Sequence, residues 1–294
     1  MTSRFKTLIR NALRWYLTNT PIRLGRYPLM MAIHPLVVEP KTIKIRTKDR
    51  GTMLLDLQDS AQFPIYYNIY EWKDKPTIEA LIQNARTVID IGGNIGQMAL
   101  LFARHAERVV TFEPIPSLAD RLQQQIALNN LEGKVILKRE ALSDHTGELR
   151  IELPSPENQG TGSSILSDHS EGHTIVVKAE SLDRILTEMN IADVDFLKMD
   201  IEGAELFALR GMTNLLTQTN NPILILEMNA KMMTAAGYGS KELLEFLLPF
   251  QYQCYEFVRG GLKGPLSKVE PVIENYCFLT ARHLDQPNIR QLIV

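Results

Sequence analysis

The chain has 294 residues, of which 45% are hydrophobic and 22% are charged, and its formal net charge is −2. This is the composition of a globular protein with room for one large α/β domain plus an extension. The two cysteines, Cys254 and Cys277, belong to no CxxC pair, which excludes a disulfide framework and a structural zinc site and predicts buried thiols.

The charge is distributed unevenly along the chain. Residues 1–50 contain eleven Lys or Arg residues and only two acids, Glu39 and Asp49, so this part carries +9 and the remainder −11. No apolar run reaches the roughly 18–20 residues that span a bilayer, and no signal-peptide pattern opens the chain. We therefore expect a cytoplasmic protein. Because the body is acidic and no motif such as NPPY is present, nucleic-acid binding is not predicted.

Residues 3–16 have the apolar spacing of an amphipathic helix, and Lys6, Arg10 and Arg14 line another of its faces. Such a helix is suited to an anionic membrane surface, and peripheral membrane contact through residues 3–16 is one interpretation. The alternative is a helix that packs on the body or on a partner chain, with its basic face in solvent. A homodimer is a further alternative for the partner.

Two short strands are expected within 42–57, around the turn 48–51, and a mostly helical segment within 64–84. From Thr87 onward, strands alternate with helices. We expect main strands at 87–91, 108–113, 134–138, 194–200, 222–228, 253–258 and 275–280. This alternation predicts a doubly wound α/β fold with a mostly parallel sheet covered on both faces. Residues 1–60 are interpreted as a basic extension and 61–294 as the main domain.

The glycine turn 90–96, with the sequence DIGGNIG, follows the first of these strands. Glycines at a strand end permit a tight turn and bring backbone N–H groups close to a ligand. Asp90 would repel a pyrophosphate, and the spacing is not GxGxxG, so a nicotinamide-dependent oxidoreductase is disfavoured. The cationic ammonium and sulfonium of S-adenosylmethionine suit a carboxylate at this position.

Further acids end the neighbouring strands. Glu113 ends the second strand, where an acid accepts hydrogen bonds from ribose hydroxyls. Glu140, Ala141 and Leu142 follow the third strand and are expected to flank the adenine. Lys198 and Asp200 close the fourth strand, with side chains on the same side because of the strand alternation.

Seven segments together give a recognisable pattern: VIDIGGNIG (88–96), FEPIP (112–116), ALSDHTGE (141–148), GSSIL (162–166), SLDRIL (181–186), DFLKMDIEGAE (195–205) and ILILEM (223–228). In order and spacing, the chain resembles the FkbM family of methyltransferases over about residues 50–230. The resemblance implies a Rossmann-like class I methyltransferase fold with a seven-stranded sheet. It also implies methyl transfer from S-adenosylmethionine to a hydroxyl of a sugar, glycan or other natural product. The family commonly has Ala in place of Gly93, a small change for the turn.

We predict the following cofactor-binding residues: Glu71, Asp90, Gly92, Gly93, Asn94, Gly96, Gln97, Glu113, Pro114, Ser117, Glu140, Ala141, Leu142 and Asp200. An alcohol acceptor needs a general base, and the catalytic candidates are Lys198, Asp200, Glu202 and Glu227, with Glu205 also considered. His169 and His173, in the insertion between the third and fourth main strands, are alternative bases. No spacing demands a metal ion, so none is predicted. The alternative function is a non-catalytic scaffold that keeps the cofactor fold.

Overall fold

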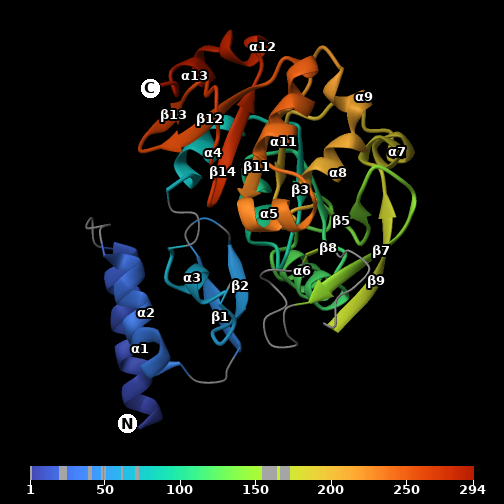
Figure 1. Cartoon of the computed structure of the whole chain (residues 1–294). Helices are drawn as coiled ribbons and strands as arrows, with labels where there is room; N and C mark the ends of the chain where they lie inside the picture. The colour runs from blue at the N-terminus through green and yellow to red at the C-terminus, as the bar shows by residue number, and fades with distance from the viewer. Residues whose placement is uncertain are drawn as a thin grey trace. The chain divides into compact units, whose positions relative to one another are not determined.

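The structure is a computed structural model that describes residues 2–19, 25–38, 42–47, 49, 51–60, 62–69, 73–153, 164–165 and 173–294. The chain divides into two compact units, Met1–Trp72 and Lys73–Val294 (Figure 1). The predicted boundary after residue 60 remains a prediction.

The first unit combines helices with a β-hairpin. Its elements are α1 (Ser3–Asn19), α2 (Arg26–Val37), β1 (Thr42–Arg46), β2 (Thr52–Asp56) and α3 (Phe63–Tyr66). The strands pair antiparallel from Thr42 opposite Asp56 to Arg46 opposite Thr52, as the alternation in the sequence predicted. The buried His34 of α2 ties the unit together, because its Nε2 lies 2.8 Å from the carbonyl oxygen of Leu57 and its ring stacks on Phe63.

The second unit is built on an eight-stranded sheet in the order β13-β12-β14-β11-β10-β3-β4-β5. The five strands from β11 to β5 are parallel, and β14, β12 and β13 are antiparallel. Their bounds are β3 (Thr87–Ile91), β4 (Arg108–Phe112), β5 (Val135–Lys138), β10 (Phe196–Met199), β11 (Ile223–Asn229), β12 (Gln253–Val258), β13 (Gly261–Lys263) and β14 (Ile273–Leu279). All seven expected strands are present, and the three-residue edge strand β13 is an eighth that we did not expect.

Helices cover both faces of this sheet. They are α4 (Lys75–Leu81), α5 (Gln97–Phe102), α6 (Pro116–Leu128), α7 (Leu182–Glu188), α8 (Glu205–Arg210), α9 (Thr213–Leu216), α10 (Ala230–Ala235), α11 (Ser240–Leu247), α12 (Ala281–Leu284) and α13 (Pro287–Arg290), with a 3-10 turn at Leu248–Phe250. On one face, Ile89 and Ile91 join a core with α7, α8, α9 and α11. On the other, Phe196 packs edge-on against Phe102 of α5. This is the predicted doubly wound α/β arrangement.

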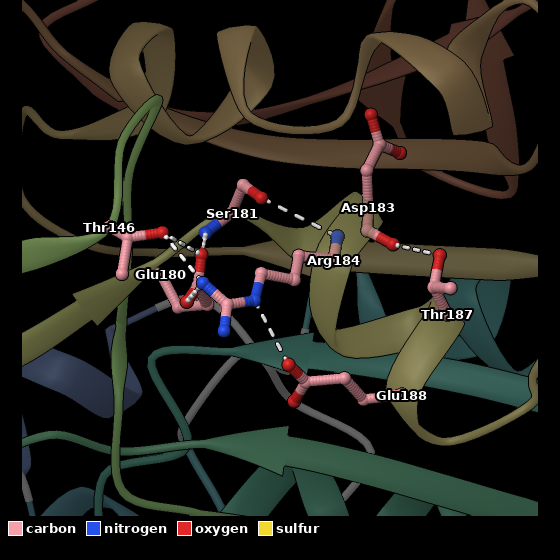
Figure 2. A network of polar contacts seen from close by, with 7 residues as sticks. All are labelled: Thr146, Glu180, Ser181, Asp183, Arg184, Thr187 and Glu188. Carbon is pink, nitrogen blue, oxygen red and sulfur yellow. Dashed lines mark hydrogen bonds and ion pairs between the residues drawn. The ribbon is translucent and has the colours of Figure 1, made fainter.

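A smaller sheet, in the order β6-β9-β7-β8, follows the third main strand. Its strands are β6 (Ala141–Leu142), β7 (Gly147–Leu153), β8 (Ser164–Ile165) and β9 (His173–Glu180). Figure 2 shows how it joins α7: Glu180 accepts hydrogen bonds from Thr146 Oγ1 at 2.7 Å and Ser181 N at 2.9 Å, and pairs with Arg184. The SLDRIL segment is therefore a helix start anchored to this sheet.

The two cysteines agree with the sequence. Cys254 and Cys277 are buried free thiols, as predicted. Among the residues that the structure describes, no helix is long and apolar enough to cross a membrane.

Candidate functional site

The glycine turn lies between the carboxyl ends of β3, β4 and β10. The amide groups of Gly92 and Gly93 both donate to the carbonyl oxygen of Phe112, at 3.0 and 2.8 Å. Gly92 has a φ of +87°, and a Cβ there would lie 2.0 Å from the carbonyl oxygen of Asp200. Only glycine combines this backbone conformation with so close an approach. The turn is therefore fixed against the end of β10, where the catalytic candidates begin.

Gly93 is closely packed in the turn. A Cβ at this position would lie 2.2 Å from Thr111 Oγ1 and 2.7 Å from Leu122 Cδ1. The turn is intact with glycine here, as expected, whereas an alanine would require Thr111 and Leu122 to shift, because the Thr111 hydroxyl occupies the space of the methyl group. Thr111 itself was missed by the sequence analysis. Its register would have revealed it, because Thr111 lies directly opposite Asp90 on the neighbouring strand.

A polar row crosses the buried sheet beneath the turn. Lys198, Asp90 and Thr111 are register neighbours on β10, β3 and β4, and none is more than 2% exposed. Thr111 Oγ1 donates to Asp90 Oδ2 at 3.0 Å. Buried polar groups are costly unless they are paired, so this row marks a site rather than a core.

Glu113 follows β4 and is also buried, with 4% of its surface exposed. Its Oε2 accepts from Asn94 N at 2.8 Å and its Oε1 from Ile115 N at 2.9 Å. Burial raises the pKa of Glu113 to about 7, and the charges of Asp90 and Asp200 act in the same direction. Each carboxylate oxygen has a second lone pair, so Glu113 can hold the glycine turn and still accept from a ribose hydroxyl.

The other predicted cofactor residues that the structure describes follow β3, β4 and β5 along the chain. Asn94, Gly96 and Gln97 form the turn and the start of α5, whereas Pro114 and Ser117 lead into α6, with Ser117 in its first turn. Glu140 follows β5, and Ala141 and Leu142 form the buried strand β6. Glu71 and His169 lie outside the described residues, as does the side chain of His173.

This donor set fits S-adenosylmethionine. Buried carboxylates end two adjacent strands, and the turn above them leaves no room for a side chain at Gly92. The carboxylates suit a cation and a ribose diol, and no basic residue of the turn would favour a pyrophosphate.

Three carboxylates form an acidic cluster next to the turn: Asp200 after β10, Glu202 in the following loop and Glu227 on β11. One oxygen from each lies within 4.8 Å of the others. Lys198, almost completely buried, places its Nζ 3.3 Å from Asp200 Oδ2. The structure thus brings together all four predicted catalytic residues. The spacing of the oxygens would accommodate a cation, and the prediction that no metal is used remains a prediction.

Glu227 is the member of the acidic cluster that holds a proton. The charge of Asp200 and burial together raise the pKa of Glu227 to about 10, and Lys198 offsets only part of this effect. At neutral pH Glu227 is therefore neutral, beside Asp200, whose Oδ2 lies 3.3 Å from Lys198 Nζ.

We expect Glu227→Gln to stabilise the protein increasingly as the pH rises. A carboxyl group with a raised folded-state pKa contributes stability below its unfolded pKa and loses it as the pH approaches the folded value. Glutamine mimics the neutral acid and removes this loss. Thermal unfolding of both proteins at about pH 5 and about pH 9 tests this. An equal change in melting temperature at the two pH values would contradict the assignment of the proton.

Glu205 is not a candidate base in this structure, although the sequence suggested it. It is 1% exposed and accepts from Tyr238 Oη at 3.0 Å and from the amides of Ile201 and Gly203 at 3.2 and 3.3 Å. Glu205 therefore holds the loop that carries Glu202, whose φ of +52° is left-handed.

Asn229 holds the same loop from β11, because its Nδ2 donates to Glu202 Oε2 at 3.1 Å. Sequence reasoning missed Asn229 and Tyr238. Asn229 directly follows the ILILEM segment, whereas Tyr238 gave no signal.

A cavity of about 460 Å³ lies at the opposite edge of the sheet, beside the amino ends of β3 and β4. Its lining includes Arg86, Arg108 and Asp193. It contains none of the predicted site residues. Ligands of open α/β sheets bind at the carboxyl ends of the strands, so we do not assign this cavity to the reaction.

Comparison with known proteins identifies the matching family. The model of the Methyltransferase FkbM domain matches residues 90–257, more than half of the chain. The region begins at Asp90 and includes the acidic cluster. The match confirms the resemblance inferred from the sequence and, with it, S-adenosylmethionine as the cofactor.

Among curated proteins, the hexuronic acid methyltransferase AglP of Haloferax volcanii is 31% identical over 160 residues, which cover 53% of this chain and 63% of that protein. Methyltransferase 1 of Beauveria bassiana is 28% identical over 145 residues, covering 42% and 57%. The chain thus aligns with less than two thirds of the length of these relatives. A crystal structure of Methyltransferase FkbM from Methylobacillus flagellatus aligns with 66% of this chain and 43% of that one, at 19% identity and a TM-score of 0.42.

Proposed function

Because the chain belongs to the FkbM methyltransferase family, we propose that it transfers a methyl group from S-adenosylmethionine to a hydroxyl of a sugar or glycan. The observation that carries the proposal is the position of the acidic cluster, directly beside the glycine turn that would hold the cofactor. Bound S-adenosylmethionine supplies the electrophilic methyl carbon.

The residues of this chain have three tasks in such a reaction. The glycine turn, Asp90 and Glu113 bind and orient the cofactor. Asp200 accepts the proton of the acceptor hydroxyl, which strengthens the nucleophile and contributes roughly 10²–10⁴-fold to the rate. Lys198 holds Asp200 in place by its ion pair. Holding the acceptor oxygen in line with the methyl group supplies much of the remaining acceleration.

A sugar acceptor agrees with the chemistry of the acidic cluster. Carboxylate oxygens accept hydrogen bonds from neighbouring hydroxyls, and a sugar offers several of these. The relative AglP is named for hexuronic acid, which has both hydroxyls and a carboxylate. A carboxylate would meet the charges of Asp200 and Glu202, so we propose a hydroxyl as the methylated group.

Calorimetric titration with S-adenosylmethionine, S-adenosylhomocysteine and NAD tests the cofactor. We expect binding of the two sulfur compounds and none of NAD.

Asp90→Ala is expected to abolish binding of S-adenosylmethionine, because the buried Asp90 carboxylate ends β3 directly beneath the turn. Normal affinity in this variant would overturn the role of Asp90. If the folded wild-type protein binds neither sulfur compound, the scaffold alternative replaces the enzyme.

The acceptor is tested by transfer of a labelled methyl group to a panel of sugars, including neutral hexoses and hexuronic acids. An alkali-stable ether product supports a hydroxyl acceptor. An alkali-labile ester on a hexuronic acid would contradict it.

A further inference from the structure

The helices α1 and α2 of the first unit expose an apolar surface. They lie side by side (Figure 1). Seven large hydrophobic side chains on them are exposed: Phe5, Leu8, Trp15, Tyr16, Tyr27, Met31 and Leu36. Leu8 is 62% exposed, Trp15 66% and Leu36 65%. Isolated exposed hydrophobic residues are normal, whereas a contiguous group marks an interaction site.

The spacing makes this surface continuous along α1. Phe5, Leu8, Ala12 and Trp15 recur every three or four residues and share one helical face. Leu13 and Leu17 are buried on the opposite side. The helix thus has two apolar faces: one is packed within the unit and the other lies in solvent.

The basic face that we expected in solvent is instead largely packed. Arg10 is 6% exposed. Arg14 donates from Nε to the carbonyl oxygen of Tyr66 at 3.0 Å, and its guanidinium lies 4.9 Å from the centre of the Tyr66 ring. The interpretation of Arg10 and Arg14 as a membrane-facing row is therefore wrong. If this helix touches lipid, the apolar face makes the contact.

Charge decides which occupant this surface fits. Neither helix contains an acidic residue, while Arg4 is exposed and Lys6 and Arg26 are half-buried. A second copy that offered the same surface would bring these cations together without a carboxylate to pair with them. An anionic lipid surface offers both phosphate groups for the cations and an apolar layer for the side chains. Trp15, Tyr16 and Tyr27 have the amphipathic rings that settle at that boundary.

We propose that the exposed apolar face of α1 docks this protein on the surface of an anionic membrane, without crossing it. The docking depends on Phe5, Leu8 and Trp15 for burial and on Arg4 for attraction to the headgroups. Docking through the first unit would tether the second unit, which carries the glycine turn and the acidic cluster, to the membrane. The proposal is independent of the reaction proposed above.

The test uses the full chain with Trp72→Phe, which leaves Trp15 as the single tryptophan. Vesicles of phosphatidylcholine mixed with phosphatidylglycerol are compared with vesicles of phosphatidylcholine alone. We expect sedimentation with the anionic vesicles and a blue shift of Trp15 emission, both weakened by salt. No binding to either vesicle would overturn the proposal.

The double variant Phe5→Gln/Leu8→Gln is expected to weaken vesicle binding by at least about tenfold, because each buried apolar side chain contributes a comparable factor or more. Leu248→Gln is the matched control, since Leu248 is 64% exposed on the second unit. If Leu248→Gln lost as much vesicle binding as the double variant, the proposal would be overturned. A dimer, measured by light scattering, that dissociates in the double variant while vesicle binding is absent would also overturn it.

Discussion

Gly92→Ala is expected to weaken S-adenosylmethionine binding by about 10²-fold, because the new methyl group displaces the glycine turn from the end of β10. The Cβ would lie 2.0 Å from a backbone oxygen of Asp200 and 3.2 Å from Ile201 Cγ2. A backbone oxygen cannot rotate away as a side chain can. The turn or the strand end must therefore move, and the cofactor residues and the acidic cluster move apart with it.

Gly237→Ala provides the matched control. Gly237 has a φ of +85°, almost the same as that of Gly92, but a Cβ there would meet nothing within 4 Å. Both substitutions carry the cost of a left-handed alanine, about 1–2 kcal/mol. Only Gly92→Ala adds the collision. Thermal unfolding and calorimetry on the two variants separate these effects, and equal cofactor affinity in both would contradict the close packing of the turn.

The sheet could be predicted from the sequence because its signals are local. The apolar run 87–91 became β3 with the same bounds, and the segment 253–258 became β12. The edge strand β13 has only three residues, Gly261–Lys263, too few for any periodicity. β13 forms because the chain turns back after β12 and pairs with that strand, with Val258 opposite Gly261.

The candidate site could be predicted only as far as strand ends reveal it. The positions of Asp90, Glu113, Lys198 and Asp200 follow from the rule that parallel strands end at one edge. The division of roles among the acids does not follow from this rule. Glu202 and Glu205 are three residues apart in one motif, yet one joins the acidic cluster and the other is buried against Tyr238. That difference depends on a partner 33 residues away in the chain.

The surface of α1 shows a different limit. The sequence predicts both an apolar and a basic face but cannot say which one packs inward. The buried position of Arg10 and the contacts of Arg14 with the first unit decide this. The Tyr66 ring holds the Arg14 guanidinium within the first unit, which helical periodicity alone does not reveal.

Asp200→Asn is expected to lower kcat by roughly 10²–10⁴-fold, the contribution of a general base. The amide keeps the shape of the side chain but cannot take a proton from the acceptor hydroxyl. It also loses the ion pair with Lys198, whose Nζ lies 3.3 Å from Asp200 Oδ2. The measurement is methyl transfer at saturating S-adenosylmethionine, with calorimetry to confirm that the cofactor still binds.

Glu227→Gln is the matched control, because it makes the same carboxyl-to-amide change within the acidic cluster. The pKa of Glu227 is raised to about 10, so its side chain is already neutral at neutral pH. We therefore expect activity within about tenfold of the wild type, a change smaller than a lost base causes. If Glu227→Gln instead loses as much activity as Asp200→Asn, Glu227 is the group that takes the proton. Asp200 then acts by keeping the basicity of Glu227 high through its negative charge.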